Sequence, residues 1–77
     1  MPRITPIGWK VLECVFFKDG FVFVRQSSSH RSYSKKGIAR PVIIPVYSEI
    51  DTEIIKSNMR TANMSREKYF KYLNQCK

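Results

Sequence analysis

Short connections between three extended segments constrain the fold of this chain more than any other feature. The segments are rich in β-branched, aromatic or alternating residues, and they predict strands at 21–26, 30–35 and 41–47. A serine run at 27–29 and a Lys-Gly pair at 36–37 are typical of turns. Parallel strands need crossover connections of about a dozen residues or more, so these strands are expected to form an antiparallel meander.

Alternation within the strands assigns their side chains to faces. In the first strand, one face holds Phe21, Phe23 and Arg25, and the other holds Val22, Val24 and Gln26. In the second strand, one side holds His30, Ser32 and Ser34, and the other holds Arg31, Tyr33 and Lys35. Pro41 and Pro45 cannot donate to a strand ladder, so the third strand is expected at an edge or paired on one side.

Helical periodicity surrounds the strands. Apolar residues three and four apart predict a helix over 7–19, which Gly20 ends. The helical period returns after residue 50, with Asp51 or Thr52 as the cap and Asn63 as a left-handed stop.

Ser65 is placed to cap a last helix. The order α-β-β-β-α-α predicts one α+β domain over residues 1–77, with helices on one face of a three-stranded antiparallel sheet and the other face open. A chain of this length has too few residues for a second core.

The charge balance favours a polyanionic partner. Fourteen Lys and Arg against six Asp and Glu give a formal charge of +8, and nucleic acid is the first candidate. No apolar run approaches the roughly 18 residues that span a bilayer, and the start lacks a secretory signal, so no membrane association is expected.

Two cysteines, Cys14 and Cys76, are too few for a disulfide framework or a zinc site. We therefore expect a reduced cytoplasmic protein in which Cys14 fills the core. One histidine, together with carboxylates placed to cap helices, does not make a metal site, so no metal or cofactor is expected.

Five basic residues between positions 25 and 40, with no acidic residue among them, are interleaved with hydroxyl groups. Guanidinium and hydroxyl groups together suit phosphate oxygens, although a solvated hairpin has the same composition. The predicted RNA-binding residues are Arg25, Ser28, Ser29, Arg31, Tyr33, Lys35, Lys36, Arg40 and Tyr47. Tyr33 and Tyr47 are candidates for stacking on bases or donating protons.

His30 is the chain's one imidazole and lies within this basic segment. An imidazole exchanges protons near neutrality, and RNA cleavage needs a base for the 2′-hydroxyl proton and an acid for the leaving 5′-oxygen. His30 is therefore the candidate catalytic residue, and a surface histidine with no such role is the alternative.

The chain resembles the HicA (YcfA-like) toxins of toxin–antitoxin pairs from about Thr5 to Leu73. The resemblance lies in the order and spacing of several pieces: the helix Gly8–Asp19 with Gly20-Phe21, the run Phe23-Val24-Arg25-Gln26 leading to Ser28-Ser29-His30, the run Ile44-Pro45-Val46-Tyr47, and the helix Ile54–Asn63 followed by Met64-Ser65-Arg66-Glu67 and Tyr69-Phe70.

The resemblance implies a fold like a double-stranded-RNA-binding domain, a ribosome-independent mRNA interferase activity and a cognate HicB antitoxin. The family's catalytic His follows Gly-Ser and lines up with His30. Ser28 stands where the family usually has Gly, and Tyr47 stands where many members carry a second His. The leaving oxygen's proton would then come from Tyr33, Tyr47, Lys35 or water, or from His30 itself.

Two other functions fit the same residues. A noncatalytic RNA-binding module would use the same basic hairpin, and a plain interaction protein would dock an acidic partner there. The edge strand 41–47 offers a route to a homo-oligomer.

Overall fold

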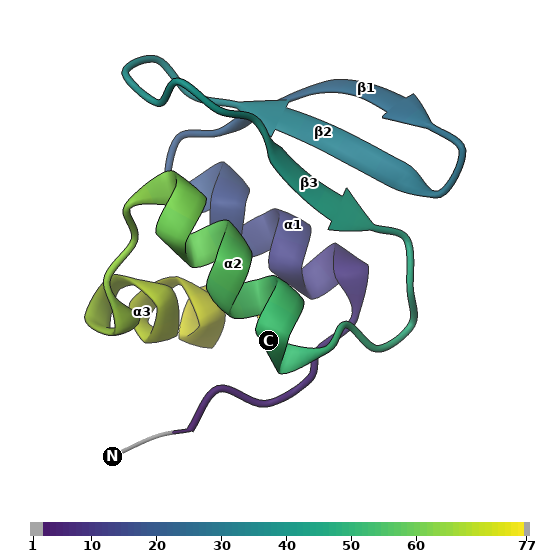
Figure 1. Cartoon of the computed structure of the whole chain (residues 1–77). Coiled ribbons are helices and arrows are strands. Elements are labelled where there is room, and N and C mark those ends of the chain that lie inside the picture. Colours follow the sequence, from purple (N-terminus) through teal and green to yellow (C-terminus); the bar gives the residue numbers. More distant parts are fainter. Residues whose placement is uncertain (1–2, 77) are drawn as a thin grey trace.

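A computed structural model describes residues 3–76, which form a three-stranded sheet with two helices against one face and a third helix packed on the first of these, away from the sheet (Figure 1). The elements in chain order are α1 (Trp9–Lys18), β1 (Val22–Ser27), β2 (His30–Ser34), β3 (Val42–Pro45), α2 (Thr52–Ala62) and α3 (Arg66–Cys76). The predicted order and α+β class are confirmed. No helix in the described part of the chain has the length and apolar character of a membrane span.

Two of the three helices end in the same way. The Phe21 N–H donates to the Phe16 carbonyl, and the Gly20 N–H donates to the Phe17 carbonyl, at 3.0 and 3.1 Å. Gly20 takes a φ of +100°, which closes this Schellman motif without a Cβ penalty. Asn63, with a φ of +54°, ends α2 in the same manner, as its residue type predicted.

The start of α3 follows the sequence as well. The Ser65 hydroxyl accepts the Lys68 N–H at 3.1 Å, which is the predicted cap of this helix. Asp51 occupies the cap position of α2, but its side chain makes no capping hydrogen bond.

The core lies between the sheet and the helices. Its buried apolar residues are Leu12, Val15, Phe16, Phe21, Tyr33, Val42, Ile44, Ile50, Ile55, Met59, Ala62, Met64, Tyr69 and Leu73. The helix layer contacts the sheet mainly through β3, and the Asn58 side chain of α2 donates to the Ile43 carbonyl at 3.1 Å. All six residues of β1 are exposed, so the hairpin of β1 and β2 extends beyond the helices.

The sheet is an antiparallel meander in the order β1-β2-β3, as predicted. β3 is an edge strand, in agreement with its prolines, and it is shorter than the predicted 41–47. Pairing of two copies along this edge stays a prediction.

A β-bulge corrects the predicted faces of β1. Phe23 pairs with Tyr33, whereas Arg25 pairs with Ser32, so the register shifts by one residue at Val24. Cross-strand partners share a face, and the shift therefore places Arg25 on the face of Ser32. Gln26 moves to the opposite, helix-facing side, because it pairs with Arg31.

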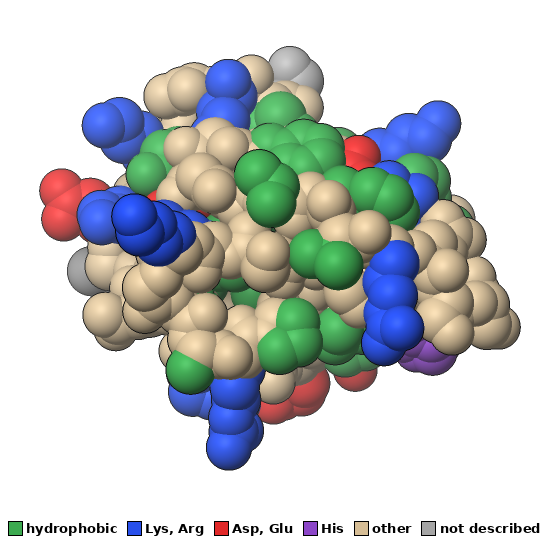
Figure 2. All heavy atoms as spheres, turned by 90° about the horizontal axis from the view of Figure 1, so that it is seen from above, with side chains coloured by type: hydrophobic (Ala, Val, Ile, Leu, Met, Phe, Trp, Pro, Cys, Tyr) green, Lys and Arg blue, Asp and Glu red, His purple; other side chains and the backbone are tan. Residues whose placement is uncertain are grey.

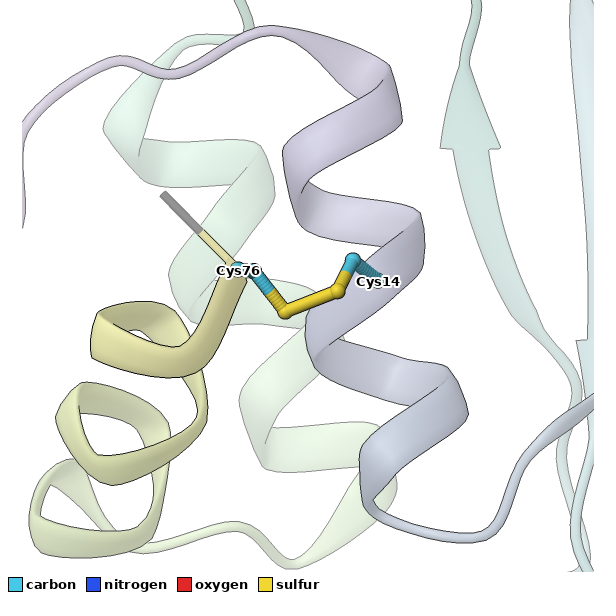
Figure 3. Close-up of a disulfide and its surroundings, with 2 residues drawn as sticks. All are labelled: Cys14 and Cys76. Carbon is cyan, nitrogen blue, oxygen red and sulfur yellow. A yellow bond between two sulfur atoms is a disulfide. The ribbon is translucent and has the colours of Figure 1, made fainter.

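The expectation of free thiols is also wrong. Cys14 of α1 and Cys76 at the end of α3 form a disulfide, with their Cα atoms 5.9 Å apart (Figure 3). The two residues are separated by 62 positions, and only the packing of α3 along α1 brings them together.

Candidate nucleic-acid interface

The sheet face that points away from the helices is the open surface that the sequence predicted. We call it the outer face; the strand pairing assigns to it Val22, Arg25, Ser27, His30, Ser32, Ser34 and Ile43. Seen from above, the molecule shows hydrophobic side chains near the middle and basic side chains around them (Figure 2). Val22 and Ile43 are 59% and 37% exposed, so apolar surface lies beside the polar groups.

His30 opens β2 and is exposed on this face. It pairs with Ser27 of β1 and with Pro45 of β3, so neighbouring strands hold its backbone on both sides. Next to it, the Ser29 carbonyl accepts the Val46 N–H at 2.7 Å. The imidazole is thus carried by a fixed backbone and open to a ligand.

Ser28 takes the backbone conformation that glycine would provide. It is the first residue of the two-residue hairpin loop before His30, and its φ is +56°. Glycine is preferred at such a position because it has no Cβ to clash. Ser28 therefore holds this left-handed conformation with a local strain of about 1–2 kcal/mol.

The bulge brings Arg25 to His30. Arg25 pairs with Ser32, two residues from His30 on the same strand face, and such diagonal neighbours lie about 7–8 Å apart. Arg25 is exposed and has no ion-pair partner among residues 3–76. A phosphate held by this guanidinium would lie close to the imidazole.

Tyr47 lies at the same end of the sheet. It is two residues beyond Pro45, the strand partner of His30, and its side chain is 46% exposed. The structure therefore gathers five of the predicted site residues in one region: Arg25, Ser28, Ser29, His30 and Tyr47.

Arg31 and Tyr33 do not join this region, although the sequence predicted both as RNA contacts, because alternation turns them toward α1. Arg31 forms an ion pair with Glu13 at 3.0 Å. Tyr33 is fully buried, and its hydroxyl donates to Glu13. A ring without exposed surface cannot stack on a base, so the structure does not support Tyr33 as an RNA contact.

The same network alters two pKa values. Burial, reinforced by the hydrogen bond to Glu13, raises the pKa of Tyr33 to about 12. The hydrogen bond to the Tyr33 hydroxyl raises the pKa of Arg31 above its usual value. Tyr33 is therefore a poor candidate for proton donation to RNA, since its hydroxyl is both buried and already engaged.

The remaining basic residues that were predicted to bind RNA lie toward the end of β2 opposite His30. Lys35 forms an ion pair of 3.4 Å with Asp19, a buried carboxylate. Lys36 and Arg40 are exposed in the connection to β3. Arg40 lines a shallow pocket with Ser57, Arg60 and Thr61 of α2, three residues that no local sequence pattern indicates.

Within residues 3–76, His, Cys, Asp and Glu side chains form no cluster of three or more that could hold a metal ion. The polar chemistry of the outer face instead comes from one imidazole, one guanidinium and hydroxyl groups.

The fold and this surface define a small α+β protein with an exposed histidine beside an exposed arginine. The family model of the HicA toxins of bacterial toxin–antitoxin systems matches residues 9–64, which is most of the chain. The chain belongs to the HicA toxin family, and this membership implies a cognate antitoxin as a partner. No curated protein and no solved structure gives a significant match.

Proposed function

We propose that the protein is a ribosome-independent mRNA interferase, a metal-independent endoribonuclease in which His30 is the catalytic residue. The observation that carries this proposal is the exposed His30 on one open sheet face beside Arg25, which has no ion-pair partner within residues 3–76. As an enzyme acting on mRNA, it would work in the cytoplasm, where a HicB-like antitoxin would cover the outer face until the toxin is released.

In the proposed reaction, Arg25 and the hydroxyls near it hold a phosphate of the RNA backbone. The neutral imidazole of His30 takes the proton of the adjacent 2′-hydroxyl. The 2′-oxygen then bonds to phosphorus while the bond from phosphorus to the 5′-oxygen breaks. The products are a 2′,3′-cyclic phosphate and, once the leaving oxygen is protonated, a 5′-hydroxyl.

Burial and ion pairing argue against two of the side chains expected from the sequence to protonate the leaving oxygen. Tyr33 is buried and Lys35 is paired with Asp19 away from His30. Tyr47, water and the His30 imidazolium formed in the first step remain. Tyr47 is exposed at the correct end of the sheet, and Tyr47→Phe distinguishes it from the other two.

Purified protein and end-labelled RNA test the proposal. His30→Ala should slow cleavage by at least about 100-fold, the usual scale for a positioned general base. RNA affinity at fixed salt should stay close to that of the wild type, because the phosphate contacts remain. Ser34→Ala, on the same face but at the other end of β2, is the matched control and should cleave normally. Cleavage by His30→Ala at the wild-type rate would refute the catalytic role.

A noncatalytic RNA-binding module is the second candidate. It is favoured by the single histidine, which leaves no second imidazole to serve as the acid. Both candidates predict binding that weakens with salt, since both neutralise phosphates. They differ in the product: intact RNA after prolonged incubation with wild-type protein would select the binding module.

A further inference from the structure

We infer that Arg31 is a positioning residue, which holds the hairpin that carries His30 against α1 through Glu13. This inference rests on the proposed cleavage of RNA by His30. We call the arrangement the Arg31 clamp; its members are Arg31, its polar partners Glu13, Gln26 and Tyr33, and the rings of Trp9 and Phe23.

The clamp engages the guanidinium group from several directions. The Nε–H is shared between a Glu13 carboxylate oxygen at 3.1 Å and the Tyr33 hydroxyl at 2.9 Å. Nη1 donates to the Gln26 side chain at 2.8 Å, and Nη2 forms the ion pair with Glu13 at 3.0 Å. Planar guanidinium suits such a fork, which the ammonium of lysine cannot reproduce.

Aromatic rings complete the clamp. The guanidinium carbon lies 4.2 Å from the ring centre of Phe23 in β1 and 5.2 Å from that of Trp9 in α1. One side chain of β2 therefore contacts the neighbouring strand and the helix below at the same time. These contacts are made at the residue directly after His30.

Backbone pairing holds His30 between β1 and β3, and the Arg31 clamp adds a side-chain link from this end of the hairpin to α1. The helix layer supports mainly β3, and every residue of β1 is exposed. Arg31 and Tyr33 are the β2 side chains whose polar contacts reach α1 through Glu13. If the clamp opens, the His30 end of the hairpin gains freedom, and a misplacement of about 1 Å can cost on the order of 100-fold in rate.

Arg31 is poorly placed to serve as an RNA contact. Its side chain is 21% exposed, and alternation puts it on the side of the strand opposite His30. A phosphate would have to compete with the Glu13 carboxylate. The negative charge of Glu13 also repels RNA phosphates, so Glu13 is not expected to bind RNA. A substitution of Glu13 therefore tests the clamp without removing an RNA contact.

The experiment measures kcat and KM for the cleavage of labelled RNA, at saturating and limiting RNA concentrations. The variants are Glu13→Gln, Arg31→Met and Arg31→Lys. Each should lower kcat by about 10-fold or more, with KM and the salt slope of RNA binding unchanged. Glu13→Gln removes a negative charge, so weaker RNA binding cannot explain a lower kcat in this variant. The double variant Glu13→Gln/Arg31→Met should be no slower than Arg31→Met, because both changes break one network.

Arg25→Met is the matched control. It should raise KM and reduce the salt slope by about 0.7, the value for one phosphate of a single strand. Rates are compared below the thermal midpoint of every variant, so that loss of folded protein does not contribute. The same behaviour from Arg31→Met, with kcat unchanged, would make Arg31 an RNA contact and overturn the inference.

Amide hydrogen exchange keeps this test independent of the enzyme activity. Glu13→Gln should speed exchange over residues 23–31 by about 10-fold, while the amides of β3 exchange as in the wild type. Unchanged exchange in the hairpin would overturn the inference. If the wild-type protein does not cut RNA at all, the proposed function fails, and the exchange measurement still decides whether the clamp holds the hairpin.

Discussion

Breaking the bond between Cys14 and Cys76 should lower the free energy of unfolding by about 4 kcal/mol. The disulfide joins residues 62 positions apart and so restricts most of the unfolded chain. Loop-closure entropy for a loop of this size is about 14 cal/mol/K, which corresponds to roughly 4 kcal/mol at 25 °C. A domain of this length has a total stability of about 4–12 kcal/mol, so the bond supplies at least about a third of it.

Denaturant unfolding of oxidised and reduced protein measures this contribution. The reduced protein should unfold at lower denaturant concentration with a somewhat larger m-value, because its unfolded state is less compact. Cys14→Ser/Cys76→Ser should match the reduced wild type and should not respond to reductant. Equal free energies of unfolding for the oxidised and reduced protein would refute the reasoning.

Two further predictions concern the hairpin loop and the core. Ser28→Gly should raise the free energy of unfolding by about 1 kcal/mol, since glycine adopts the φ of +56° without strain. Ser29→Gly, the neighbouring control, should give no gain. Equal effects of the two changes on chemical denaturation would contradict a strain at Ser28. Burial raises the pKa of Tyr69 from its usual 10.0 to about 12. The neutral phenol is therefore favoured by folding, and its contribution is complete below about pH 10 and is lost as the pH rises toward 12. Tyr69→Phe should move the alkaline unfolding midpoint to higher pH, whereas Lys71→Ala on the exposed side of α3 should not. An unmoved midpoint in the Phe variant would contradict the raised pKa of Tyr69.

Local sequence rules predicted most of the fold. The helix stops at Gly20 and Asn63 and the cap at Ser65 depend on neighbouring residues alone, and the structure has all three. Connection lengths required an antiparallel meander, which follows from chain geometry rather than from tertiary contacts.

The outer face was harder to assign from the sequence. Strict alternation put Arg25 with Phe23, but the extra residue at Val24 reverses the side on which Arg25 lies. A bulge depends on the pairing of two strands, so no pattern within β1 alone indicates it. The bulge nevertheless places the exposed guanidinium of Arg25 on the face of His30.

The basic segment 25–40 also looked more uniform in the sequence than it is. Glu13 and Asp19 of the α1 region neutralise Arg31 and Lys35 across the tertiary fold. Their positions about 16–18 residues upstream give no local signal of this pairing. The same holds for the disulfide, which joins cysteines near opposite ends of the chain.

The ends of the RNA fragments test the catalytic role of the ribose hydroxyl most directly. Purified wild-type protein is incubated with an RNA and with the same sequence carrying 2′-O-methyl groups throughout, and the products are analysed by mass spectrometry. We predict fragments that end in a 2′,3′-cyclic phosphate from the RNA and no cleavage of the methylated strand. Cleavage of the methylated strand, or no cleavage of either, would contradict the proposed use of the 2′-hydroxyl by His30.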